Sequence, residues 1–208
     1  MTAKEYRARA RQHLSGNWGI LILAYVLYGV IVGAISCTGV GAIASLVLAG
    51  PFSVGIVGMY LSVRRTGRTE IGMLFDGFRT GLGNRIVGGI LYTLFLMLWT
   101  FLFWVPGIIK TFSYAMTFYI MCDNPEMSGN DAITLSRKMM NGNKFRLFCL
   151  YFSFIGWMIL SVFTFGIGYL FLYPYMSMAT AEFYEDLKAQ QEPLVTEEPQ
   201  EPTFTVEV

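Results

Sequence analysis

Charged residues are scarce in this sequence and absent from long stretches of it. Only 14% of the 208 residues are charged and 54% are hydrophobic, whereas soluble domains carry about 25% charged residues. The segments Leu14–Val63 (50 residues) and Leu147–Ala181 (35 residues) contain no Asp, Glu, Lys or Arg, and Ile86–Cys122 (37 residues) contains only Lys110. A soluble domain of this composition would lack a polar surface, so the sequence predicts an integral membrane protein.

Residues that bind metals or perform catalysis are also few. His13 is the single histidine, which excludes a histidine-based metal cluster, and the three cysteines are too few for a disulfide framework. The chain contains neither a Gly-x-Ser-x-Gly elbow nor a phosphate-binding loop with its lysine. We therefore expect no catalytic residue, no metal and no cofactor, and a protein that is not an enzyme.

The three apolar segments have a length that suits pairs of helices. One membrane span needs about 20 apolar residues, so each segment is too long for one helix and fits two helices joined by a tight turn. The sequence predicts an all-α, polytopic membrane bundle of about six spans in three hairpins. In the third segment each helix would have only about 17 residues, near the lower limit, and a re-entrant segment is the alternative there. The first apolar segment lacks the small-residue cleavage site of a signal peptide, so we expect a permanent span.

A threefold pattern indicates internal repeats over residues 1–63, 69–122 and 128–184. Each unit has a basic segment closed by Gly-Asn, then an apolar segment with a proline in its second half and a tyrosine near its end. We expect the Gly-Asn pairs to end surface helices, the prolines to kink spans, and the tyrosines to lie in an interfacial belt. These residues are Gly16, Asn17, Gly83, Asn84, Gly142 and Asn143; Pro51, Pro106 and Pro174; and Tyr60, Tyr119 and Tyr184.

Three short amphipathic helices are expected before the apolar segments. Thr69 would cap a helix with Ile71, Leu74, Phe75 and Phe78 on one face, and Ser128 with Asp131 resembles a capping box before Ala132, Leu135 and Met139. At the N-terminus, Tyr6, Ala10 and Leu14 oppose Lys4, Arg7 and Arg11. Such helices either lie in the membrane interface or pack against the bundle from the cytoplasm.

Fourteen of the fifteen Lys and Arg residues lie in the N-terminal segment, the two loops between hairpins, or the C-terminal tail. By the positive-inside rule these regions are cytoplasmic, so we expect a multi-pass bacterial plasma-membrane protein with both termini inside. Membrane-impermeant thiol reagents should then label Cys37 from outside, and Cys122 only after lysis.

Lys110 is the one ionisable residue within an apolar segment. Intramembrane charges often serve function, but a lysine near the outer surface can also extend its ammonium to the lipid head groups. Arg79, Arg137 and Lys138 are further candidates for contact with lipids or partners. Gly29 and Gly33 form a small-xxx-small pair that we expect to join spans of one chain, with a homo-oligomer as the alternative.

The C-terminal region differs from the rest of the chain. We divide the chain into a membrane domain over residues 1–187 and a disordered acidic tail over 188–208, because five glutamates and three prolines follow residue 191 with few large apolar residues. The final segment 203–208 alternates like a strand and could add to the sheet edge of a partner. Membrane lipids and a membrane-protein partner are the expected partners, with no nucleic acid.

Several motifs resemble a known family, the integral membrane family of Gram-positive bacteria defined as domain of unknown function 975. The resemblance covers residues 1 to about 187 and implies a multi-pass plasma-membrane protein without an established activity or catalytic residues. The family is also distantly similar to the membrane domain fused to some glycerophosphodiester phosphodiesterases, which implies a lipid context. The motifs are Phe103-Trp-Val-Pro-Gly-Ile-Ile-Lys110, Ser113-Tyr-Ala-Met116, Asp123-Asn-Pro125, Ala132-Ile-x-x-Ser-Arg-Lys-Met139, Gly142-Asn-Lys-Phe145, Phe154-Ile-Gly-Trp157 and Phe183-Tyr-Glu185.

Two functions are compatible with these features. The first is a non-enzymatic scaffold or accessory subunit in membrane, lipid, secretion or transport processes, which the small loops, surface helices and solvated tail favour. The alternative is a small transporter or lipid-translocating protein that uses the repeat interface and Lys110.

Overall fold

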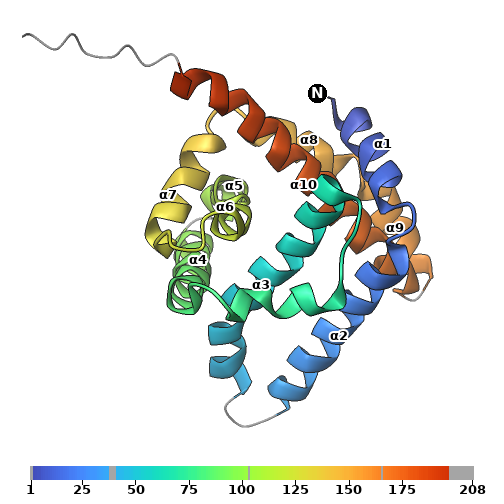
Figure 1. The fold of residues 1–208 in the computed structure, drawn as a ribbon, viewed down its shortest axis with the longest axis horizontal. Helices are drawn as coiled ribbons and strands as arrows, with labels where there is room; N and C mark the ends of the chain where they lie inside the picture. Colours follow the sequence, from blue (N-terminus) through green and yellow to red (C-terminus); the bar gives the residue numbers. More distant parts are fainter. Residues whose placement is uncertain (1, 38–40, 103, 165, 197–208) are drawn as a thin grey trace, which may run out of the picture.

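The structure, a computed structural model, describes residues 2–37, 41–102, 104–164 and 166–196, and every regular element in these residues is a helix (Figure 1). This confirms the all-α prediction. In chain order the helices are α1 (Ala3–Leu14), α2 (Trp18–Ser36), α3 (Gly41–Thr66), the 3₁₀ helix η1 (Ile71–Phe78), α4 (Leu82–Leu102), α5 (Trp104–Tyr114), α6 (Thr117–Asp123), α7 (Gly129–Met139), α8 (Lys144–Phe152), α9 (Ile155–Phe163) and α10 (Ile167–Thr196).

Among the described residues, four helical segments are long and apolar enough to cross a membrane: Trp18–Ser36, Ala44–Thr66, Leu82–Phe101 and Lys144–Phe163. The prediction of a membrane protein is thus supported, whereas six spans are not. The two remaining expected spans do not have the length or apolar character of a membrane span. The helix after α4 is divided into α5 and α6, of 11 and 7 residues, and the apolar half of α10 carries several tyrosines and Glu182.

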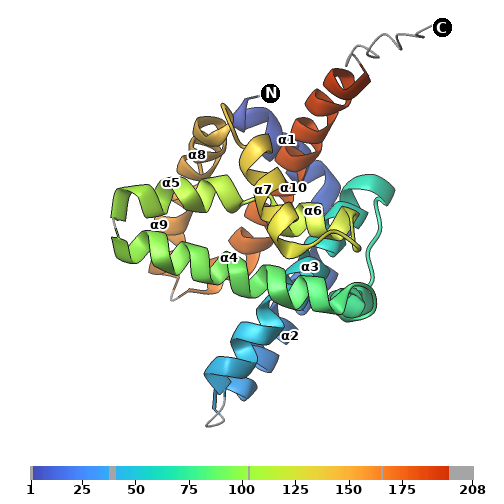
Figure 2. The same ribbon diagram turned by 90° about the vertical axis from the view of Figure 1, so that its left-hand side faces the viewer.

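The helix ends next to the expected outer turns lie away from the C-terminal half of α10. In Figure 2 the end of α2 lies at the bottom, the junction of α4 and α5 at the far left, and the end of α9 between them. The C-terminal half of α10 rises to the upper right. The helix pairs therefore spread apart from a common base rather than running parallel.

Helices α3 and α10 form the centre of the molecule. α3 packs against α2, η1, α4, α6 and α10, while α10 also contacts α1, α2, α8 and α9. Tyr6, Ala10 and Leu14 of α1 are buried, as the periodicity predicted, and α1 packs on α10. The apolar face of α1 is thereby covered by protein, in agreement with packing against the bundle.

Glycines let α4 pass close to two neighbours. A Cβ placed on Gly89 would lie 2.6 Å from Gly50 Cα of α3, and one on Gly129 of α7 would lie 2.3 Å from Gly88 Cα. By contrast, no atom lies within 4 Å of a Cβ placed on Gly29 or Gly33. The prediction that the latter pair joins spans of this chain is therefore wrong, and glycines of α3, α4 and α7 are among those that allow close helix contacts instead.

In the first and third units the glycine of the Gly-Asn pair has the left-handed conformation, whereas Asn17 (φ −111°) and Asn143 (φ −105°) do not, and in the second unit another glycine makes the turn. Gly16 (φ 91°) lies in the turn after α1, and Gly142 (φ 78°) lies in the turn after α7. In the second unit Gly83 and Asn84 lie inside α4, and Gly81 (φ 61°) makes the turn. A side chain at Gly81 would also meet Pro125 O at 2.1 Å, so both backbone conformation and space require glycine there.

The side-chain amide of each asparagine in the Gly-Asn pairs donates a hydrogen bond to a backbone carbonyl. Asn17 Nδ2 donates to Gly67 O (2.9 Å), and Asn84 Nδ2 donates to Glu126 O (3.1 Å). Asn143 Nδ2 donates back to Met139 O (3.3 Å) and its Oδ1 accepts from Arg146. The first two bonds join each unit to the segment that follows it.

The three prolines have different positions along their helices. Pro51 lies inside α3 and Pro174 inside α10, where each removes a backbone hydrogen bond. Pro106 lies in the first turn of α5, where proline is tolerated, and the kink expected at this residue stays a prediction. The second unit is interrupted further along, between α5 and α6.

The segment 71–78 is a 3₁₀ helix instead of the expected amphipathic α-helix, and Thr69 makes no cap to it. A Cβ placed on Gly77 would lie against Pro51 O of α3, so a glycine is needed where this helix approaches α3. The capping prediction for α7 is confirmed, because Ser128 Oγ accepts from Asp131 N (3.2 Å) and Ala132 and Met139 are buried.

Helix α10 continues beyond the expected domain boundary at residue 187 and ends at Thr196. The first part of the expected tail is therefore helical. The predicted strand over 203–208 lies outside the described residues.

Candidate functional site

A cavity of about 460 Å³ lies where helices from all three predicted units meet. Its walls come from α2, α3, α4, α5, α6, α8 and α10. Six tyrosines line it, two from each of the three units: Tyr28, Tyr60, Tyr92, Tyr119, Tyr151 and Tyr173. We call this cavity the tyrosine chamber.

The lining of the chamber combines apolar side chains with hydroxyl groups and carries no charge. Besides the tyrosines it contains hydroxyl side chains of Ser53, Thr111, Ser177 and Thr180, and no Asp, Glu, Lys or Arg. The Tyr151 hydroxyl lies 3.2 Å from Thr180 Oγ1, and Tyr119 OH donates to Ser177 O (3.5 Å). The wall formed by α10 thus collects hydroxyl groups at the centre of the bundle.

The tyrosines predicted to form an interfacial belt are buried instead. Tyr60, Tyr119 and Tyr184 are 2%, 6% and 3% exposed. Tyr60 and Tyr119 line the chamber, and the Tyr184 ring packs 5.2 Å from that of Tyr119. The belt prediction is therefore wrong, since these side chains face inward, where each hydroxyl can find a partner.

The chamber has a sequence signal that the repeat comparison missed. Tyr92 and Tyr151 each follow the asparagine of their Gly-Asn pair by eight residues, and Tyr25 has the same offset in the first unit. Tyr25 stacks on Tyr173 with ring centroids 4.2 Å apart, while Tyr28, one turn further, lines the chamber. The first helix of each unit therefore brings a tyrosine to the same region.

One wall of the chamber contains the break between α5 and α6. Ser136 of α7 is fully buried, and its Oγ donates to Ser113 O (2.9 Å) and accepts from Met116 N (3.2 Å). One hydroxyl thus satisfies a backbone acceptor and a backbone donor that the interrupted helix leaves free. Such satisfaction is required in an apolar environment.

A second break separates α8 from α9. Arg7 of α1 donates from Nη1 to Ser153 O (3.1 Å), and its guanidinium carbon lies 5.9 Å from the centre of the Phe154 ring. A side chain of an N-terminal or loop helix therefore binds backbone at each break.

An ion-pair network closes the base of the bundle beside Tyr119. Asp123, at the end of α6, binds Arg65 through both carboxylate oxygens (2.9 Å each) and Lys188 Nζ at 2.8 Å. Tyr184 OH donates to the same carboxylate (3.1 Å), and Arg65 Nε also binds Glu185 (2.8 Å). The network joins α3, α6 and α10 next to the chamber.

Two further carboxylates of α10 lie on the same helical turn. The side chain of Glu182 is 1% exposed, with Oε1 at 3.2 Å from Arg64 Nε and 3.3 Å from His13 Nε2. Neither Glu182 Oε1 nor Arg64 Nε has a partner in hydrogen-bond geometry, so the Arg64 contact is electrostatic. Asp186 binds Arg146 at 2.7 Å and accepts from Tyr6 OH. We call the contacts of Glu182, Glu185, Asp186 and Asp123 the ion-pair base.

Two of these carboxyl groups have lowered pKa values. Burial alone would raise the pKa of Asp123, but the hydrogen bonds from Arg65 and Lys188 outweigh it, so its pKa lies below the ordinary value. For Asp186 burial likewise opposes ionisation, and the hydrogen bonds from Tyr6 and Arg146 prevail and lower the pKa. Both groups therefore remain ionised to lower pH than free aspartate.

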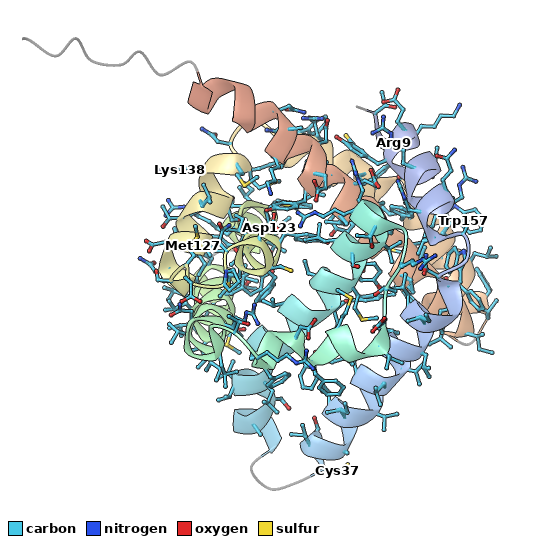
Figure 3. The ribbon with its side chains drawn as sticks, in the orientation of Figure 1. Arg9, Cys37, Asp123, Met127, Lys138 and Trp157 are labelled. Atoms are coloured by element: carbon cyan, nitrogen blue, oxygen red, sulfur yellow. The ribbon has the colours of Figure 1, made fainter. Side chains whose placement is uncertain are left out.

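None of the four predicted candidate cations lines the chamber. Lys110 Nζ lies 4.5 Å from the centre of the Trp99 ring of α4, a cation–π contact on the hairpin. Arg79 pairs with Asp76 (3.3 Å), and Arg137 and Lys138 are exposed on α7. Figure 3 shows Lys138 and Arg9 at the end of the molecule opposite Cys37, with Asp123 between them.

In the part of the chain that the structure describes, no group of three or more His, Cys, Asp or Glu residues could hold a metal ion.

Comparison with known proteins identifies one family. Residues 104–191 match the model of a family described as "Protein of unknown function (DUF975)". The matched region, which runs from α5 into α10, is less than half of the chain. No curated protein and no solved structure matches the sequence. The match supports similarity to an uncharacterised family and assigns no activity.

Proposed function

We propose that this protein is a small membrane transporter whose substrate site is the tyrosine chamber and whose substrate is a small amphipathic organic cation. The single observation that carries the proposal is the cavity of about 460 Å³, lined by two tyrosines from each unit, where the three units meet. Its volume falls in the range of small-molecule sites, about 300–1,000 Å³, and transporters commonly bind their substrates at repeat interfaces.

The lining favours a cation over an anion. Aromatic rings carry negative faces that attract cations, and hydroxyl oxygens accept hydrogen bonds. No Asp, Glu, Lys or Arg lines the chamber, so an ion of either sign would lack a charged partner there, and the negative faces of the rings favour a cation. An organic cation with apolar groups is weakly hydrated, so its transfer from water into the chamber costs little, and its apolar groups can pack against the rings.

The ion-pair base supplies a gate on the proposed cytoplasmic side. Tyr119 lines the chamber and packs on Tyr184, whose hydroxyl is held by Asp123. Passage along this route requires the pairs of Asp123 with Arg65 and Lys188 to separate. The interrupted helix α5–α6 beside the chamber provides the kind of broken element that transporters use.

The membrane placement that accompanies this function has both termini in the cytoplasm of a bacterial cell and the chain in its plasma membrane. The concentration of cations away from the outer turns supports it, as does the separation of Cys37 from Arg9 and Lys138 (Figure 3). We propose three hairpin units, with α5–α6 and α10 as the second members of the last two. We also propose that the whole chain, and not only residues 104–191, belongs to the Gram-positive family. The similarity to the membrane domain of glycerophosphodiester phosphodiesterases stays a prediction.

Two probes of matched shape and opposite charge test the proposal. Tetraphenylphosphonium should bind the purified protein in lipid nanodiscs, and tetraphenylborate should not. Tyr60→Leu should weaken phosphonium binding by about tenfold, because cation–π contacts in desolvated sites are worth roughly 1–2 kcal/mol, whereas Tyr60→Phe should bind nearly as wild type. Tyr169→Leu is the control, since Tyr169 is 41% exposed and outside the chamber.

Equal binding of the two probes, or equal loss in the Tyr169 control, would refute the proposed site. Uptake of phosphonium by proteoliposomes then tests transport itself, and Lys110→Ala should leave uptake unchanged because Lys110 does not line the chamber. The alternative, a non-enzymatic scaffold, stays a prediction. It is tested by affinity capture with the full chain and with a chain that lacks residues 186–208. A scaffold should lose bound partner proteins when these residues are removed, whereas a transporter should not.

A further inference from the structure

A groove of about 540 Å³ lies between α1, the start of α2, α9 and α10, and shares no lining residue with the tyrosine chamber. Arg7 and Arg11 of α1 line one part of it, and Trp18, Trp157, Leu160 and Phe171 line the apolar part. We call it the arginine groove. It combines a cationic part with apolar walls.

The two arginines of the groove differ from those of the ion-pair base. Arg64, Arg65 and Arg146 each have a carboxylate partner from α10. Within residues 2–37, 41–102, 104–164 and 166–196, neither Arg7 nor Arg11 is within 4.0 Å of an acidic group in any ion pair. The groove therefore has two cations whose charge the surrounding protein does not balance.

Arg7 also retains unused hydrogen-bonding capacity. Its Nη1 donates to Ser153 O, but its Nε is buried without a hydrogen-bond partner. A guanidinium has five N–H donors in a planar fork, whose geometry matches the oxygens of a phosphate. A buried donor left unsatisfied is costly, and an anion in the groove would provide an acceptor.

The apolar walls face the surroundings of the bundle. Trp157, Leu160 and Phe171 are 55%, 54% and 56% exposed, and they belong to helices α9 and α10. Trp18 lies beside Phe171 with ring centroids 6.4 Å apart. Tryptophan is enriched at the level of the lipid head groups, so the groove spans the height at which a phospholipid changes from phosphate to acyl chain.

The geometry points to an anionic phospholipid of the surrounding leaflet as the occupant of the arginine groove. Its phosphate binds Arg7 and Arg11, and its acyl chains lie against Trp157, Leu160 and Phe171. Because Arg7 also binds the backbone at the α8–α9 break, the lipid and the interrupted helix share one side chain. This site is independent of the proposed transport function, since the two cavities have no common residue.

Native mass spectrometry of the full chain, purified with phosphatidylglycerol and phosphatidylcholine in equal amounts, tests the inference. We expect one phosphatidylglycerol to remain bound, and the double variant Arg7→Gln/Arg11→Gln to reduce its retention at least about tenfold, because two charge-assisted contacts are lost. The matched control is Lys4→Gln/Arg9→Gln, which removes two exposed cations from the same helix outside the groove. It should retain the lipid as wild type.

A second variant keeps the charges and fills the apolar part. Leu160→Trp should displace the acyl chains and reduce lipid retention while leaving Arg7 and Arg11 in place. The inference can therefore still be tested if the arginine variant fails to fold. Undiminished retention in both variants would overturn the inference. So would equal loss in the Lys4/Arg9 control, which indicates a general charge effect, or equally tight binding of glycerol 3-phosphate, which indicates a free phosphate site.

Discussion

Ser136→Ala is a substitution for which the structure predicts a large effect of a single hydroxyl. Ser136 Oγ is fully buried and holds both Ser113 O and Met116 N at the break between α5 and α6. Alanine leaves one acceptor and one donor unsatisfied, and each such group costs about 1–3 kcal/mol when buried. Allowing for partial relaxation, we expect a loss of about 3 kcal/mol, which corresponds to a decrease in Tm of roughly 10 °C for a chain of this size.

Thermal unfolding of the detergent-solubilised protein, followed by circular dichroism, measures this effect. Ser113→Ala is the matched control, because Ser113 is also buried at the same break but its hydroxyl bonds only to Ile109 O, four residues earlier in its own helix. We expect the control to lose less than about 1 kcal/mol. If the two variants unfold at the same temperature, Ser136 does not stabilise the break, and the account of how the interrupted helix is satisfied is incorrect.

Three further outcomes follow from the packing, the charges and the topology. Gly89→Ala should lower Tm, since its Cβ would lie 2.6 Å from α3 backbone, whereas Gly29→Ala, with nothing within 4 Å, should leave Tm equal or higher. Because the pKa of Asp123 is lowered in the folded protein, its contribution is complete above the unfolded value of about 3.9 and is lost as pH falls through the folded pKa; Tm measured from pH 7 to pH 3 should therefore decrease less in Asp123→Asn than in wild type. A membrane-impermeant maleimide should label Cys37 in intact cells and Cys122 only after lysis, and the reverse pattern would invert the proposed orientation.

The features that the sequence predicted best are those set by local physical chemistry. Absence of charge over long segments predicts membrane helices without knowledge of their partners, and the periodicity of Tyr6, Ala10 and Leu14 gave the buried face of α1. Gly16 and Gly142 were recognisable because a left-handed turn has few alternatives to glycine.

The errors arose where the local signal was ambiguous. The Gly-Asn pair predicted the turn at Gly83, whereas Gly81 has the positive φ of the turn and lies against Pro125 O. A proline was the expected cause of irregularity in the second unit, whereas the break between α5 and α6 lies beyond Pro106 and is held by Ser136, twenty residues after Met116. No periodicity in the sequence reveals that a distant hydroxyl will replace a helical hydrogen bond.

The candidate site was less predictable than the fold. The constant spacing of eight residues between the asparagine of each Gly-Asn pair and a tyrosine could have indicated that these tyrosines occupy equivalent positions. Whether such a tyrosine faces lipid or the interior depends on the rotation of its helix, which neighbouring helices determine. The contact of His13 with Glu182 joins residues far apart in sequence and could not have been predicted from either residue alone.

The carboxylates of α10 join the first and third proposed units. Glu182, Glu185 and Asp186 occupy one helical turn and bind arginines of α3 and α8. Because α3 belongs to the first unit and α10 to the third, a movement of either of these units relative to the other would separate the pairs of Glu182 and Glu185. The side chain of Glu182 is almost completely buried, so a movement that takes Arg64 away would leave a buried charge without its partner, which is costly. The more exposed pairs around Asp123 separate at lower cost, so an opening of the tyrosine chamber toward the base should proceed by movement of α6 away from α3 and α10, while α10 and α3 remain joined at Glu182.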